Sequence, residues 1–80
     1  MTRDRYIEKC IAASFKIRRY LRICDVEWID SDLCVFKGIK YYPYGYSLRF
    51  ENGRAVHICE LRSLNTSSIT YAQLDKVEEI

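Results

Sequence analysis

Glycine and proline are scarce in this 80-residue chain, with three and one respectively, and no apolar run is long enough to span a bilayer. So few chain breakers predict that most residues lie in regular helices and strands joined by short connections. No glycine-rich loop is present to hold a phosphate group. The first five residues lack the apolar stretch of a signal peptide, so we expect a cytoplasmic protein.

Paired metal ligands are also lacking. The four cysteines are Cys10, Cys24, Cys34 and Cys59, and none of them forms a C-x-x-C pair with another. Each one falls at an apolar position of an expected helix or strand, which favours reduced, buried thiols over disulfides. His57 and Cys59 are the only close His/Cys pair, so the sequence predicts no metal site and no cofactor.

The composition, 49% hydrophobic and 30% charged, predicts one small globular domain over residues 1–80. The net charge of +2 conceals a strong segregation. Residues 1–22 hold seven basic and two acidic side chains, whereas residues 23–36 hold four acidic ones and no base. Local electric fields can therefore be strong although the total charge is small.

The first segment has the spacing of an amphipathic helix, at about residues 4–22. Its inward face would carry Tyr6, Cys10, Ala13, Ile17, Leu21 and Cys24. Four cations, Arg5, Lys9, Lys16 and Arg19, would share the opposite side. That arc is either a solvated face or a stripe that contacts nucleic-acid phosphates.

Alternating residues predict four antiparallel strands after this helix. Residues 24–29 and 33–36 would form a hairpin around an acidic turn. Asn52-Gly53 is the preferred two-residue hairpin turn, and it would join residues 46–50 to residues 55–61. Counting outward from this turn places His57 opposite Leu48 on the side facing the core. A core histidine is favoured there over a general base.

The C-terminal segment has two interpretations. Thr70-x-x-Gln73 has the form of a capping box, which predicts a short helix at about residues 71–79 with Tyr71, Leu74 and Val77 inward. A short edge strand fits the same residues.

The expected fold is α+β, an N-terminal amphipathic helix packed on a four-stranded antiparallel sheet. Apolar residues remain on the second sheet face: Ile29, Leu33, Val35, Val56 and Ile58. Either the C-terminal segment or a second subunit would cover them, so a homodimer stays open.

The most unusual stretch is residues 41–46, where four of six residues are tyrosine. Pro43 and Gly45 predict a loop, and a loop cannot bury four large rings in so small a core. We therefore expect exposed rings that serve as anchors for a partner. The predicted partner-binding residues are Tyr41, Tyr42 and Tyr44, with a polar rim of Lys37, Lys40 and Arg49.

These features indicate a small non-enzymatic adaptor or inhibitor that binds a protein or a nucleoprotein complex. In size and character the chain resembles accessory proteins of phages and mobile elements, including anti-CRISPR inhibitors. The alternative is a protein that binds single-stranded nucleic acid by stacking bases on the tyrosines, with phosphates on the basic helix face.

An enzyme of one class is a further alternative. In size and expected layout the chain is similar to small bacterial ribonuclease toxins of the RelE type. That similarity implies an active site built from Arg49, His57, Arg62 and Tyr71.

Overall fold

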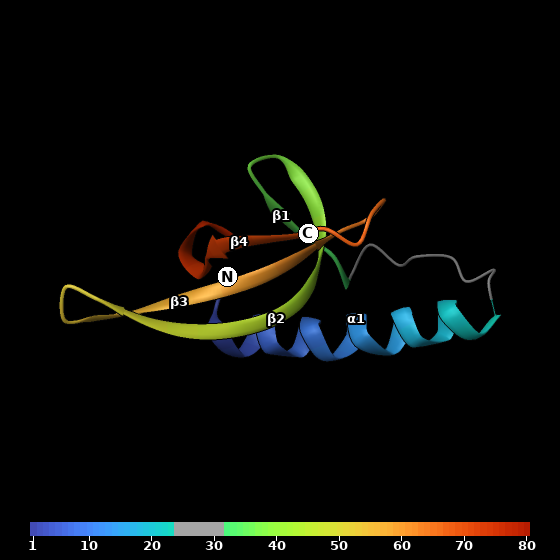
Figure 1. Cartoon of the computed structure of the whole chain (residues 1–80), viewed down its shortest axis with the longest axis horizontal. Helices are drawn as coiled ribbons and strands as arrows, with labels where there is room; N and C mark the ends of the chain where they lie inside the picture. The colour runs from blue at the N-terminus through green and yellow to red at the C-terminus, as the bar shows by residue number, and fades with distance from the viewer. Residues whose placement is uncertain (24–31) are drawn as a thin grey trace.

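The computed structural model describes residues 1–23 and 32–80. Its elements are helix α1 (Arg3–Ile23), strands β1 (Cys34–Phe36), β2 (Ile39–Glu51), β3 (Arg54–Ser63) and β4 (Ile69–Gln73), the 3-10 helix η2 (Leu74–Lys76) and strand β5 (Glu78–Glu79). The helix lies along one side of an antiparallel sheet with strand order β4-β3-β2-β1-β5 (Figure 1). The predicted α+β fold is confirmed, with five strands rather than four.

The hairpin around Asn52-Gly53 forms as the sequence predicts. Both residues have positive φ, 52° and 75°, which is the backbone of a type I′ turn. Phe50 lies opposite Ala55 and Leu48 opposite His57, in the predicted register. Turn chemistry therefore fixes the pairing of the two longest strands from the turn as far as Gly45.

The tyrosine-rich segment is strand, and its prediction as a loop is wrong. It belongs to β2, which begins after a tight turn at Lys37-Gly38 with φ values of 52° and 76°. Pro43 and Gly45 mark a β-bulge, where the register with β3 shifts. A bulge tolerates proline because the ladder hydrogen bond is interrupted there, so these two residues bend the strand without ending it.

The other predicted hairpin is described only in part. Residues 24–29 lie outside the described residues. The predicted strand 33–36 is confirmed as β1, which pairs with β2 on one side and with β5 on the other. Of the apolar residues left over on the second face, Leu33 and Ile58 are buried within the chain, and Val35 and Val56 are half-buried.

The C-terminal helix prediction is wrong, and the strand alternative holds. Residues Ile69–Gln73 form β4, which pairs with β3 over its whole length. The capping-box pattern therefore marks no α-helix, and of the predicted range 71–79 only Leu74–Lys76 is helical, as the 3-10 helix η2. Leu74 and Val77 are buried as predicted, but Tyr71 is 60% exposed, because it alternates with the buried Ala72 along the strand.

The sheet must curl strongly. Strands β4 and β5 lie at its two edges, four strand spacings or about 19 Å apart if the sheet were flat. Yet only residues 74–77 connect them, and three of these form η2. A 3-10 helix rises about 2 Å per residue, so the connection spans about 14 Å at most. The edges are therefore drawn toward each other, as the curved ribbons in Figure 1 show.

Curling creates a small enclosed core. The main buried cluster comprises Tyr6, Cys34, Cys59, Leu61, Ala72, Leu74 and Val77. The helix joins this core through Tyr6, whose hydroxyl donates a hydrogen bond of 2.9 Å to the Glu60 carbonyl oxygen. Cys10 packs against the cluster, and Ala13 is buried in a second one with Leu33 and Tyr42.

Candidate binding surface

Two of the predicted tyrosine anchors belong to the interior. Tyr42 is 2% exposed and packs with Ala13 and Leu33 between the helix and the sheet. Tyr41 is half-buried and packs against the main core. The placement of Tyr42 among the exposed partner-binding residues is therefore wrong, because its strand position packs it against the helix, whereas Tyr44 lies in the bulge.

The other four predicted residues are exposed but do not form one site. Tyr44, at the bulge, is 55% exposed. Lys37 and Lys40 are exposed at the opposite end of β2, near its turn with β1. Arg49 lies five residues beyond Tyr44 on the same strand, about 17 Å away at the rise of an extended chain.

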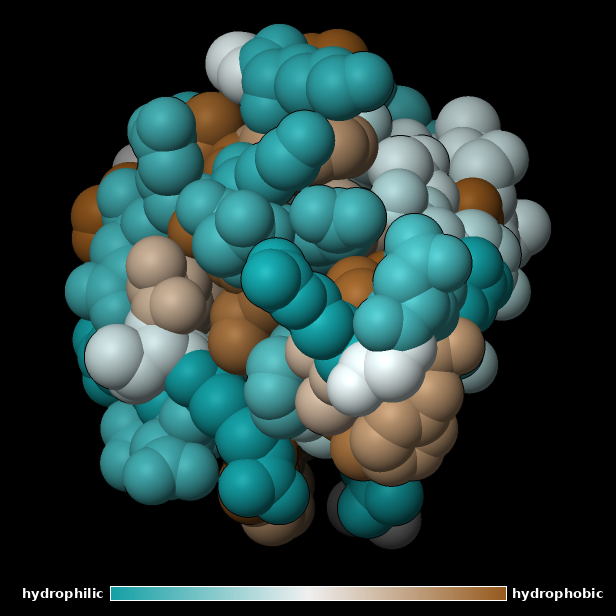
Figure 2. Space-filling model, turned by 90° about the vertical axis from the view of Figure 1, so that its left-hand side faces the viewer, coloured by the Kyte–Doolittle hydropathy of each residue, from teal (hydrophilic) through white to brown (hydrophobic). Residues whose placement is uncertain are grey.

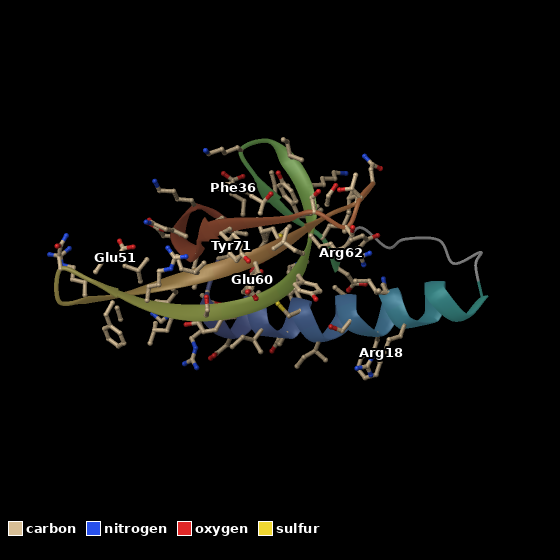
Figure 3. All side chains as sticks on the ribbon, viewed as in Figure 1. Arg18, Phe36, Glu51, Glu60, Arg62 and Tyr71 are labelled. Carbon is tan, nitrogen blue, oxygen red and sulfur yellow. The ribbon has the colours of Figure 1, made fainter. Side chains whose placement is uncertain are left out.

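The structure brings a different group of residues together around Tyr44. Glu60 and Arg62 alternate with the buried Cys59 and Leu61, so both lie on the other face of β3, where they are half-buried and Arg62 is paired with Tyr42. Tyr71 lies opposite Glu60 on β4, and Gly45 lies opposite it on β2. Figure 3 shows Tyr71 and Glu60 near each other over the middle strands, with Arg62 farther along β3. We call Tyr44, Glu60, Arg62 and Tyr71 the outer tyrosine patch.

Gly45 shapes this patch. A Cβ atom on Gly45 would collide with the carboxylate of Glu60. The Glu60 side chain therefore lies over the backbone of the bulge, next to Tyr44. The patch thus combines two large exposed rings with one acidic and one basic side chain, all on adjacent strands.

The sequence interpretation did not place Tyr71 among the partner-binding residues and named it only for the ribonuclease alternative. The capping-box pattern turned it inward. The alternation of side chains along Ile69–Gln73 could have identified it. If Ala72 points into the core, its neighbour Tyr71 points outward. An alternating pattern of only five residues is weak evidence for a strand when the same residues also fit a helix pattern.

The predicted basic arc on the helix does not form a solvent-facing stripe. Lys9 is 2% exposed, and its ammonium donates a hydrogen bond of 3.1 Å to the Leu33 carbonyl oxygen. Lys16 forms an ion pair with the Asp32 carboxylate. Both lysines thus bind Asp32 and Leu33, the two residues that precede β1. Their prediction as members of an open basic face is therefore wrong.

The remaining two members of the arc differ from each other. Arg5 is exposed and lies 3.4 Å from the Glu8 carboxylate and 3.6 Å from that of Glu79. The side chain of Arg19 lies outside the described ones. Of the arc's four cations, only Arg5 is therefore seen at the surface.

Three cysteines lie in the interior as reduced thiols. Burial raises the pKa of the Cys10 thiol to about 11 and those of Cys34 and Cys59 to about 12. The pKa of the neighbouring Tyr6 hydroxyl is raised for the same reason. These groups therefore stay protonated at neutral pH and are poor nucleophiles there. Cys24 lies outside the described residues.

We expect the protein to lose stability in alkaline solution. A thiol whose pKa is raised by folding contributes its full stabilisation below the pKa of the unfolded chain, near about 8.5, and loses it as the pH rises toward the folded value. The urea midpoint should therefore fall between about pH 9 and pH 11. As a control, Cys10, Cys34 and Cys59 should resist alkylation at pH 8 until urea is added. A urea midpoint that does not change with pH, or fast alkylation of these cysteines in the native protein, would contradict the burial of the thiols.

His57 lies at the end of the core with a defined partner. Its Nδ1 is hydrogen-bonded to the Tyr46 hydroxyl, and the two rings stack with their centroids 5.7 Å apart. The guanidinium of Arg3 lies 5.6 Å from the Tyr46 ring. A cavity of about 340 Å³ opens beside His57 and is lined mainly by apolar atoms of Met1, Ala55, Val56 and Leu74 together with Gln73 and Asp75.

The four residues implied by the ribonuclease similarity do not converge. His57 follows the core-facing side of β3, together with Cys59. Arg49 lies opposite Val56, on the other face of the same hairpin. Arg62 and Tyr71 belong to the outer tyrosine patch. One substrate phosphate therefore cannot contact His57 and the other three at once in this arrangement.

The described residues hold no group of three or more His, Cys, Asp or Glu side chains placed to bind a metal ion. No helix in residues 1–23 or 32–80 has the length and apolar character needed to cross a membrane. No family model matches the chain, and searches of curated proteins and of solved structures find no match. The function is therefore argued from the geometry of the surface itself.

Proposed function

We propose that this protein is a small non-enzymatic binding module that engages a protein, or the protein part of a nucleoprotein complex, through the outer tyrosine patch. One observation carries the proposal. Tyr44 and Tyr71 are 55% and 60% exposed, the first next to Gly45, which pairs with Glu60 on one side, and the second paired with Glu60 on the other, although four of the chain's other tyrosines are buried or half-buried. Tyrosine offers a large contact area at a small cost in conformational entropy, which suits it to anchoring an interface.

The charges around the rings favour a protein partner over nucleic acid. Glu60 lies between Tyr44 and Tyr71, where a phosphate backbone would be repelled. Arg62 lies two residues away on the same face, so the patch presents both signs of charge. An aromatic centre beside an arginine is typical of protein interfaces, where such residues carry most of the binding energy.

The helix supports the same choice. The stacking hypothesis needs a basic helix face beside the tyrosines, but Lys9 and Lys16 are engaged with the segment before β1. Phosphate contacts would then depend on Lys37, Lys40 and scattered arginines. An adaptor or an inhibitor, which works by occupying a partner's surface, needs only the patch.

The test is affinity capture with a double variant. Tagged wild-type protein is expected to retain a specific protein from nuclease-treated native lysate, and Tyr44→Ala/Tyr71→Ala is expected to lose it. Loss of two anchor rings weakens an interface by about 2 kcal/mol or more, or at least 30-fold. Quantitative mass spectrometry of the retained fraction measures the difference.

Ile39→Ala is the matched control, because Ile39 is 56% exposed on the same strand but far from the patch. It should retain the partner as the wild type does. Equal retention by the double variant, with circular dichroism showing both proteins folded, would remove the patch as the binding site. Retention that disappears on nuclease treatment or in high salt would favour the nucleic-acid alternative.

A further inference from the structure

The outer half of the β2–β3 hairpin, residues 47–57, projects from the molecule as a two-stranded arm. β1 pairs with β2 only over residues 39–41, and β4 pairs with β3 only over residues 58–62. Within residues 32–80, no third strand therefore flanks the arm on either side. Figure 1 shows it extending past the N-terminal end of α1, along the 46 Å axis of a molecule only 22 Å across. A ribbon of two strands is marginally stable by itself and gains from a further strand.

One face of the arm is apolar and exposed. Leu48 is 46% and Phe50 75% exposed, and Ala55, opposite Phe50, is exposed as well. These residues continue the face that carries Cys59 in the core, but the helix does not reach this far. Figure 2, which views the molecule from the tip of the arm, shows hydrophobic surface between hydrophilic side chains. An exposed phenylalanine on an open strand edge favours association with another strand.

The backbone of the same residues is directed outward. Glu51 and Arg54 close the two-residue turn and exchange both of their backbone hydrogen bonds. Alternation then points the amide and carbonyl groups of Phe50 and Leu48 away from β3. The apolar side chains and the open hydrogen-bonding groups therefore belong to the same two residues of β2.

We propose that the occupant of this edge is a second copy of the chain, paired antiparallel through β2 with a two-fold axis at Phe50. In this register Phe50 faces Phe50 of the second copy, and Leu48 reaches the same ring diagonally. The pairing involves the tip of the arm only, so it leaves helix α1 and the outer tyrosine patch free. This surface is separate from the one proposed to bind a partner protein.

Charge selects this register. Arg49 and Glu51 are both exposed on the opposite face of β2. An axis at Phe50 places each Arg49 directly across from Glu51 of the second copy, twice by symmetry. Moving the axis by one residue would instead set the two copies of Arg49 against each other. The strand is thus self-complementary in charge at the register that also pairs the phenylalanines.

The contact is short, so we expect a weak dimer that forms as the protein concentration rises. Sedimentation equilibrium should show the average mass of the wild type rising toward twice the 9.5 kDa of one chain. Arg49→Glu alone and Glu51→Arg alone place like charges across the axis, and each should weaken self-association about tenfold or more. An equimolar mixture of the two variants restores both opposite-charge pairs and should associate as the wild type does.

Lys40→Glu is the matched control, since it makes the same change of charge at an exposed position outside the arm and should behave as the wild type. Circular dichroism of each variant checks folding, and Phe50→Ser should abolish association without unfolding the chain. A wild type that stays monomeric, an Arg49→Glu variant that associates unchanged, or a mixture that stays monomeric would each overturn the proposal.

Discussion

Tyr42→Ala is expected to lower the free energy of unfolding by about 3–5 kcal/mol, the cost of removing a large buried ring. Tyr42 is 2% exposed and fills the space between Ala13 of the helix and Leu33. Its loss should leave a cavity where the helix meets the sheet. Since domains of this size have about 5–15 kcal/mol in total, much of the stability would be lost. The melting temperature, followed by circular dichroism, measures the effect.

Tyr44→Ala is the matched comparison, because it removes the same side chain two positions along the same strand. Tyr44 is 55% exposed, so the change in stability should stay within about 0.5 kcal/mol. Equal melting temperatures for the two variants would mean that Tyr42 is not a core residue. The sequence interpretation, which placed both rings on a loop, would then be restored.

Tyr6→Ala is expected to cost a similar amount, about 3–5 kcal/mol, by detaching the helix from the sheet. Tyr6 is fully buried among Cys59, Leu61 and their neighbours, and its hydroxyl is bonded to the Glu60 carbonyl oxygen at 2.9 Å. Tyr6→Phe keeps the ring and removes only the hydrogen bond. It should cost about 1–2 kcal/mol, because the carbonyl loses its buried donor. Urea unfolding measures both variants.

Phe15→Ala serves as the control on the same helix. Phe15 is 62% exposed, so its removal should change the urea midpoint little. If Tyr6→Ala were no more harmful than Phe15→Ala, the helix would not be docked through Tyr6. The face of α1 that contacts the sheet would then need to be reassigned.

The parts of the fold that follow from local chemistry could be predicted from the sequence. Asn52-Gly53 determines a turn with two positive φ values, and the register of β2 and β3 follows from it by counting. The inward face of the helix at Tyr6 and Ala13 follows from its periodicity. In each case, neighbouring residues alone decide the structure.

The tyrosine segment could not be predicted in this way, because its structure depends on pairing with distant strands. Pro43 and Gly45 are turn residues in isolation, yet pairing with β3 on one side converts them into a bulge. The weaker turn signal at Lys37-Gly38 is the one that the chain uses. Once β2 is a strand, Tyr42 is carried into the interior and Tyr44 remains outside.

Lys9 shows a second reason why the sequence alone predicts a residue's position incorrectly. Helical periodicity treats a lysine as an outward residue, since burying an unpaired ammonium is costly. The ammonium of Lys9 is satisfied by the Leu33 carbonyl oxygen, which belongs to a segment 24 residues away in the chain. No local pattern reports such a partner. The candidate site changed for the same reason, because Tyr71 joins Tyr44 only through the pairing of β3 with β4.

The most direct test of the outer tyrosine patch is a footprint of the two rings in a complex. Surface labelling of tyrosine, read by mass spectrometry, is carried out on the protein alone and on the protein bound to its captured partner. Tyr44 and Tyr71 are expected to be labelled readily in the free protein and to be protected together in the complex. If both rings remain fully labelled while the partner is bound, the patch is not the binding surface and the proposed function loses its basis.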